Sequence, residues 1–248
     1  MKKYFKYRRI EFIMNVLAIG CHPDDLEIAC TGTLARLARE GHNVYMAHVA
    51  NGNMGHAVIM PPELREMRAE EARQAGKLIG AKEVFNIDID DCMVRAENRD
   101  AIRKIVGIIR KTRPDFIITH NPDDYMEDHV QTSKLVYEAS FTSSVPHMYP
   151  EYEAYSLVPP IYYMDTLAGV GFLPEEYVDI SEDIELKIRA LDCHQSQIKW
   201  MREHDKIDFL EFVRTCSRFR GLQSGVPYAE GFRICKEWPR QITKRLLP

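Results

Sequence analysis

The chain has 248 residues, a formal net charge of −4, 45% hydrophobic residues and 28% charged residues. This length can hold one large α/β domain or two small ones, and the composition is ordinary for a globular protein. The chain has no basic stripe among its aromatic residues and no apolar run of roughly 20 residues, so we expect neither nucleic-acid binding nor a membrane span. Its six cysteines include no CxxC pair and its basic start resembles no secretory signal, so we expect a cytoplasmic protein with free thiols.

Short runs of β-forming residues alternate with longer helical patterns over the first 140 residues. The predicted strands are 15–21, 44–49, 84–87 and 116–119, and the predicted helices are 31–40, 61–79, 99–111 and 130–139. The helix limits follow from Gly41 and Gly80 at two ends and from Pro61 at one start. This alternation indicates right-handed crossovers and a parallel sheet.

The rest of the chain is less regular. It is predicted to contain a long loop at 142–160, a strand at 161–164, helices at 181–193 and 209–219, and a late edge strand at 230–236. No repeat or linker divides it. We therefore predict a single α/β domain over 15–248, with a Rossmann-like, doubly wound, mostly parallel sheet and helices on both faces. The basic residues 1–14 are predicted to be an N-terminal extension.

Two polar clusters follow the first and fourth predicted strands. The first is Cys21-His22-Pro23-Asp24-Asp25-Leu26-Glu27, and the second runs from His120 to His129. In the common doubly wound order these two strands are neighbours, and the chain reverses direction between them. We therefore expect the clusters to face each other across the crevice at the carboxyl ends of the strands.

The residue types in these clusters indicate a metal site. His22 and Asp25 lie three residues apart in a turn, and His129 could supply a third ligand from the opposite wall, as in catalytic zinc sites. Asp24 would then be free to act as a general base beside a metal-bound water, which favours hydrolysis of an amide or ester.

Plainer interpretations stay open. The His-Pro-Asp-Asp stretch is also typical of a turn, and Asp128 and His129 could simply cap a helix. His120 is more often a strand-end residue bonded to backbone than a ligand. A Rossmann-type nucleotide binder is disfavoured, because no G-x-G-x-x-G follows the first strand.

Several segments resemble the PIG-L/LmbE-like N-acetylglucosaminyl deacetylases. The resemblance rests on the stretch from His22 to Glu27 with Gly32-Thr33-Leu34 after it, on Arg68-Ala-Glu-Glu71-Ala72, on Asp128-His129, and on Lys187 to Gln197 with its His194-Gln-Ser-Gln end. It spans roughly residues 16–197.

This resemblance implies a function and a set of site residues. It implies one zinc ion on His22, Asp25 and His129, a water activated by Asp24, and removal of acetyl from an N-acetylglucosamine-type sugar or glycoconjugate. It further implies that Arg68 contacts the substrate, with Arg65 as a rival, and that the loop beginning at Asn51 borders the pocket. Family members are often oligomeric, so a homo-oligomer is a further expectation, with a small-molecule amino sugar as the substrate.

One position departs from the family pattern. Where the family usually has the first histidine of His-x-Asp-His, this chain has Met126, and Asp128 would normally orient that histidine. Methionine donates no hydrogen bond, so either another residue stabilises the oxyanion, or the reaction differs, or the protein is a weak enzyme. The candidates are Tyr125, His194 and His120, of which we favour Tyr125. Two alternatives are an amidase acting on a thiol-sugar conjugate and a metal- and sugar-binding protein with little catalysis.

Overall fold

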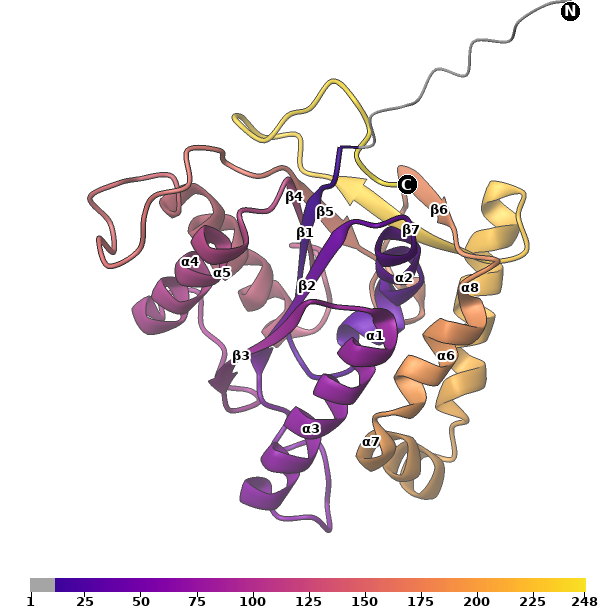
Figure 1. The fold of residues 1–248 in the computed structure, drawn as a ribbon. Coiled ribbons are helices and arrows are strands. Elements are labelled where there is room, and N and C mark those ends of the chain that lie inside the picture. Colours follow the sequence, from indigo (N-terminus) through magenta and orange to yellow (C-terminus); the bar gives the residue numbers. More distant parts are fainter. Residues whose placement is uncertain (1–11) are drawn as a thin grey trace, which may run out of the picture.

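The alternating strands and helices build one seven-stranded sheet of order β3-β2-β1-β4-β5-β7-β6 in a computed structural model that describes residues 12–248 (Figure 1). The strands are β1 Asn15–Gly20, β2 Asn43–Ala50, β3 Glu83–Ile89, β4 Phe116–Thr119, β5 Ile161–Met164, β6 Glu176–Asp179 and β7 Ala229–Ile234. The helices are α1 Asp25–Ala29, α2 Thr31–Arg39, α3 Pro61–Ile79, α4 Arg99–Thr112, α5 Glu127–Thr142, α6 Ile184–Asp192, α7 Gln195–Trp200 and α8 Phe209–Ser224. A 3₁₀ turn, η1, spans Leu167–Gly169, and a π-helical turn, η2, continues α7 over Met201–Asp205. Most of the predicted extension at 1–14 lies outside the described residues.

The predicted strand order around β1 is confirmed. β1 pairs in parallel with β2 on one side and with β4 on the other, where Val16 lies opposite Phe116. β3 and β5 extend the parallel part of the sheet at its two sides. The chain therefore reverses its direction of winding between β1 and β4, as a doubly wound fold requires.

The last two strands correct one prediction. The segment predicted as an edge strand forms β7, which lies inside the sheet between β5 and β6 and is antiparallel to both. Its Glu230 and Phe232 are buried. The edge strand at this end of the sheet is β6, which sequence reasoning missed because Glu176 and Asp179 leave it no apolar run like those of the equally short β4 and β5.

Helices cover both faces of the sheet, and each face has its own core. Val16 and Ala18 of β1 pack on the side of α1, α2, α3, α6 and α8, whereas Leu17 and Ile19 pack on the side of α4 and α5. Consecutive strand residues point to opposite faces, so a strand buried on both sides reads as a continuous apolar run. The predicted α/β fold with helices on both faces is confirmed.

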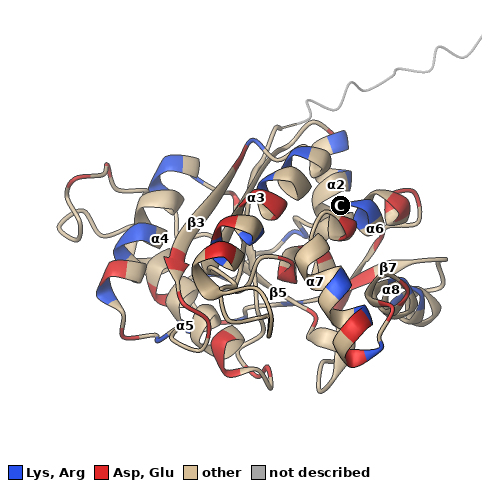
Figure 2. Cartoon of the chain, turned by 90° about the horizontal axis from the view of Figure 1, so that it is seen from below, with Lys and Arg blue, Asp and Glu red and all other residues tan. Residues whose placement is uncertain are grey.

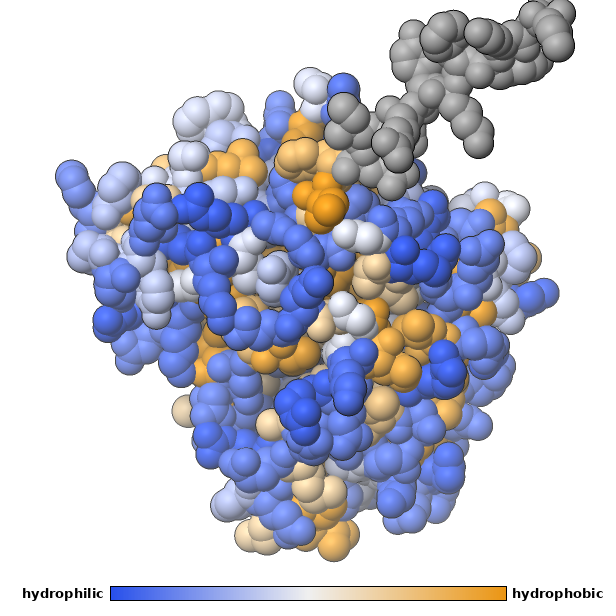
Figure 3. Space-filling model, viewed as in Figure 1, coloured by the Kyte–Doolittle hydropathy of each residue, from blue (hydrophilic) through white to orange (hydrophobic). Residues whose placement is uncertain are grey.

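The surface is of mixed character. Lysines and arginines are interspersed with aspartates and glutamates along the helices (Figure 2), and the face seen in Figure 3 is mostly hydrophilic with small hydrophobic patches. Among the described residues, no helix combines the length and the apolar character needed to cross a bilayer.

Candidate active site

A pocket of about 330 Å³ lies at the carboxyl ends of β1 and β4. Its polar wall includes His22, Asp24 and Asp25 from the first cluster and His120 and His129 from the second. The two clusters therefore meet, as their positions after neighbouring strands predict. The pocket lies at the topological switch point, where open α/β sheets bind their ligands.

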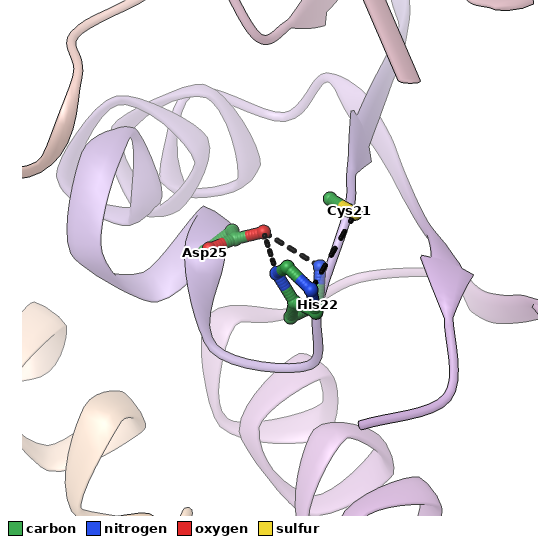
Figure 4. A group of neighbouring side chains, drawn as sticks. All are labelled: Cys21, His22 and Asp25. Atoms are coloured by element: carbon green, nitrogen blue, oxygen red, sulfur yellow. Dashed lines mark hydrogen bonds and ion pairs between the residues drawn. The ribbon is translucent and has the colours of Figure 1, made fainter. Parts of the chain in front are cut away.

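Asp25 is at the centre of this polar wall. Its Oδ1 lies 3.4 Å from Nε2 of His129, and its Oδ2 lies 3.4 Å from Nδ1 of His22 and 3.2 Å from Nε2 of His120. The backbone N–H of His22 also donates to Asp25 Oδ2 at 2.6 Å, and the ring of His22 lies between Asp25 and Cys21 (Figure 4). Within residues 12–248, two groups of side chains have ligand atoms within 4.8 Å of one another, Asp25 with His120 and His129, and Asp25 with His22 and Cys21.

The predicted ligands His22, Asp25 and His129 are divided between these two groups, yet they remain within reach of one ion. The ring centroids of His22 and His129 are 5.5 Å apart. A zinc ion lies about 2.1 Å from a ligating nitrogen and hence about 3.2 Å from the ring centre, so two rings on one tetrahedral ion have centres about 5 Å apart. The observed spacing fits such an arrangement.

Each of these two histidines has a carboxylate on one ring nitrogen and turns the other toward Asp25. Nδ1 of His129 lies 3.0 Å from Asp124 Oδ2, and its buried Nε2 has no hydrogen-bond partner. Nε2 of His22 lies 3.4 Å from Asp128 Oδ2. The second ring nitrogen of a metal-ligating histidine usually hydrogen-bonds a carboxylate or another acceptor in this way.

The charges around these rings agree with that arrangement. Burial favours the neutral ring of His129, but the carboxylates of Asp25 and Asp124 outweigh it and raise the pKa of His129 to about 10. Burial also opposes the charged form of His22, yet Cys21, Asp128 and Asp25 raise its pKa well above the usual value. Both sites thus favour a positive charge, which a bound divalent ion can supply instead of the proton.

His120 differs from the other two histidines. Its Nε2, which lies 3.2 Å from Asp25 Oδ2, accepts a hydrogen bond of 2.9 Å from the backbone N–H of Cys21, so the lone pair of this nitrogen is already in use. Burial and the neighbouring His129 lower the pKa of His120 to about 4, which keeps this ring neutral. The expected strand-end bond to backbone is thus present, although the ring also lines the pocket.

Asp24 lies beside this group in a strained backbone conformation. Its φ of 127° lies in the region that favours glycine, and such outliers concentrate at functional sites. Burial raises the pKa of Asp24 to about 6, against the opposing charge of Arg68. A carboxylate with a pKa near neutrality suits proton transfer.

Arg68 is held by the loop that follows β2. It is buried, lies 3.0 Å from Asp24 Oδ2 and donates to the carbonyl oxygens of Pro23 and Gly52. A Cβ on Gly52, whose φ is +77°, would lie 2.6 Å from three atoms of the Arg68 side chain. Glycine at this position therefore leaves the space through which Arg68 reaches the pocket.

Two predicted or rival substrate contacts lie elsewhere. Asn51 is buried but does not line the pocket, since its side-chain amide donates to Asp88 and Asp90 at 3.1 and 3.0 Å. Arg65 is half-exposed and pairs with Asp88 on the surface. Arg68 therefore lines the pocket, whereas Asn51 stabilises the loop that contacts Arg68.

The candidates for a replacement of the family histidine are in three different environments. Tyr125 is 55% exposed, does not line the pocket, and has its hydroxyl 3.5 Å from the carbonyl oxygen of Leu167. His194 is fully buried, with Nε2 3.5 Å from Glu27. Of the three, only His120 lines the pocket, so the structure gives no support to the preference for Tyr125.

Sequence reasoning missed two residues that shape the site. Asp124 holds His129, and Asp91 accepts the backbone N–H groups of Gly52 and Met54 at 2.8 and 3.0 Å. Asp124 carried a usable signal, because an aspartate just before a helix start is typical of a local turn, here with the N–H of Met126. Asp91 carried none, since its partners lie 37 or more residues away.

The fold and this pocket define a class of protein, an α/β protein with a buried His/Asp group at its strand ends that could hold a divalent ion. A family model described as GlcNAc-PI de-N-acetylase (PIG-L) matches residues 17–140, half of the chain, and the chain belongs to this family. The resemblance seen in the sequence is thereby confirmed.

Two relatives extend the match over most of the chain. The chain is 30% identical over 234 residues to diacetylchitobiose deacetylase of Thermococcus kodakarensis, with 90% of this chain and 83% of that protein covered. The structure of N,N'-diacetylchitobiose deacetylase from Pyrococcus horikoshii superposes with a TM-score of 0.77 at 28% identity, covering 89% of this chain and 83% of that one.

A third structural neighbour shows that similarity of fold does not identify the reaction. The structure of a 4-carboxy-2-hydroxymuconate hydratase from Pseudomonas putida superposes with a TM-score of 0.79, covering 94% of this chain and all of that chain, at 22% identity. This likeness concerns the fold only. Because one fold can support different reactions, the function must be argued from the site.

Proposed function

We propose that this chain is a zinc-dependent hydrolase that removes the acetyl group from an N-acetylglucosamine-type sugar. The observation that carries the proposal is the bare, buried Nε2 of His129, held by Asp124 and aimed at Asp25. Family membership supports the deacetylase activity, and the two diacetylchitobiose deacetylases support an amino-sugar substrate.

The residues that would hold the ion are His22, Asp25 and His129. His22 is preferred to His120 as the third ligand, because His22 has a carboxylate behind its ring whereas the Nε2 of His120 already accepts from Cys21. Two imidazoles, a carboxylate and an open position are typical of catalytic zinc. A divalent ion at this position would polarise the amide carbonyl and lower the pKa of water in the pocket.

Asp24 would perform both proton transfers. Its carboxylate takes a proton from the attacking water as the new C–O bond forms, and returns a proton to the sugar nitrogen as the C–N bond breaks. The products are acetate and the free amine. Arg68, 3.0 Å from Asp24, keeps that carboxylate in place.

The test combines elemental analysis with an assay of amine release. We expect about one equivalent of zinc per chain, release of acetate and amine in equal amounts from N-acetylglucosamine derivatives, and loss of turnover on chelation that zinc restores. Bound metal without hydrolysis of any N-acetyl sugar would contradict the proposal and favour the binding-protein alternative.

A further inference from the structure

The pocket has a second wall that the proposed chemistry does not use. We define it as the apolar wall, formed by Ile28, Met54, Met126, Leu167, Met201 and Phe209. These side chains come from α1, the loop after β2, the residue before α5, η1, η2 and the start of α8. Six separate segments thus bring apolar side chains to the same cavity that contains the His/Asp group.

The apolar wall is not ordinary core. Met54 is 54% exposed, and Met126, Leu167 and Met201 are only partly buried. Apolar side chains that line a cavity beside a polar centre are typical of a ligand site. Methionine is unusually adaptable, so three methionines suit a ligand of variable apolar shape.

The position of Met126 strengthens this interpretation. It is the N-cap of α5, where Ser, Thr, Asp or Asn is preferred, and its side chain makes no capping hydrogen bond. Its side chain instead lines the pocket beside His129. The departure from the family motif therefore extends the apolar wall up to the polar centre.

Polar groups near the apolar wall are already engaged. Asp165 is bound by Arg220, with N–O distances of 2.6 and 3.0 Å, and the side-chain amide of Gln197 donates to the carbonyl oxygen of Gly55 at 3.2 Å. They offer few free partners for the hydroxyl groups of a second sugar. A ligand on this side of the pocket gains more from apolar burial than from new hydrogen bonds.

We propose that the apolar wall binds an alkyl or aryl aglycone attached to the amino sugar. This inference rests on the proposed function, in which the acyl group removed is an acetyl. An acetyl group is too small to cover the apolar wall, so the aglycone is the part of the substrate that would contact it. The substrate class is then an apolar glycoside of N-acetylglucosamine rather than the free sugar.

The test compares kcat/KM for the methyl and hexyl β-glycosides of N-acetylglucosamine. Burying one methylene improves binding about fourfold, so burial of two of the five added methylenes predicts a hexyl-to-methyl ratio of about 15. Met201→Gln should lower this ratio at least threefold, whereas Met201→Leu should keep it. Met148→Gln is the matched control, since Met148 is an exposed methionine that does not line the pocket.

The outcomes separate the two proposals. A hexyl-to-methyl ratio of kcat/KM near one would overturn the aglycone site while deacetylation stands. The same conclusion would follow if lengthening the acyl group to N-hexanoyl raised kcat/KM more than lengthening the aglycone to hexyl. If the protein hydrolyses none of these glycosides, both the proposed function and the inference that rests on it are overturned.

Discussion

Replacing Gly52 by alanine should damage the site more than the fold. Gly52 has φ +77°, and an added Cβ would lie 2.6 Å from Cδ, Nε and Nη1 of Arg68. The guanidinium group must therefore move, and it is the group that contacts Asp24 at 3.0 Å. A hydrogen bond to a charged group contributes about 1.5–3 kcal/mol, so its loss should lower kcat/KM by about 10- to 100-fold.

Gly225 provides a matched control for the backbone cost. It has φ +79° at the end of α8, and a Cβ there would meet no atom within 4 Å. Alanine in a left-handed conformation costs about 1–2 kcal/mol, so Gly225→Ala should lose about this much stability in urea unfolding. Gly52→Ala should lose at least as much, because its Cβ also meets the buried Arg68 side chain. Only Gly52→Ala should lose deacetylase activity.

The comparison is read from kcat/KM and unfolding free energy measured on the same preparations. If Gly52→Ala keeps wild-type kcat/KM while losing at least as much stability as Gly225→Ala, then the position of Arg68 does not matter to the reaction. The assignment of Arg68 as the residue that holds Asp24 would then be refuted.

Three further variants test individual roles. Asp24→Asn should keep its zinc content and lose at least about 100-fold in kcat, because it removes the proposed general base; normal turnover would disprove that role. Asp124→Asn should weaken zinc binding about 10- to 100-fold, since it removes the partner of His129, and an unchanged dissociation constant in a chelator competition would speak against it. His22→Ala should lose zinc whereas His120→Ala should retain it, and elemental analysis showing the reverse would exchange their assignments.

The elements of the N-terminal half of the chain could be predicted well because their sequence signals are local. The continuous apolar run of β1 is typical of a strand covered on both faces, and Gly80 marks the end of α3. The strands of the C-terminal half were harder to predict. β6 has no apolar run, and the place of β7 inside the sheet depends on pairing with β5 and β6. Such pairing is non-local and leaves no pattern within the strand itself.

The site shows the same division between local and distant information. The meeting of the two polar clusters follows from strand order alone, so it could be predicted. The choice between Arg65 and Arg68 could not, because both lie on α3 and only the tertiary structure pairs Arg65 with Asp88 and Arg68 with Asp24. Asn51 was likewise predicted to border the pocket, but its side chain hydrogen-bonds Asp88 and Asp90 instead.

Asp128, which the family resemblance pairs with a histidine at position 126, has other partners in this chain. With Met126 in that place, the carboxylate of Asp128 accepts the backbone N–H of Cys92 at 2.6 Å and lies 3.4 Å from Nε2 of His22. His22 and His129 each have a carboxylate near the ring nitrogen that faces away from Asp25. Met126 offers no hydrogen-bond donor, and its side chain adds to the apolar wall that we propose binds the aglycone. The departure at position 126, which in the sequence suggests weak catalysis, thus contributes apolar surface to the proposed aglycone site.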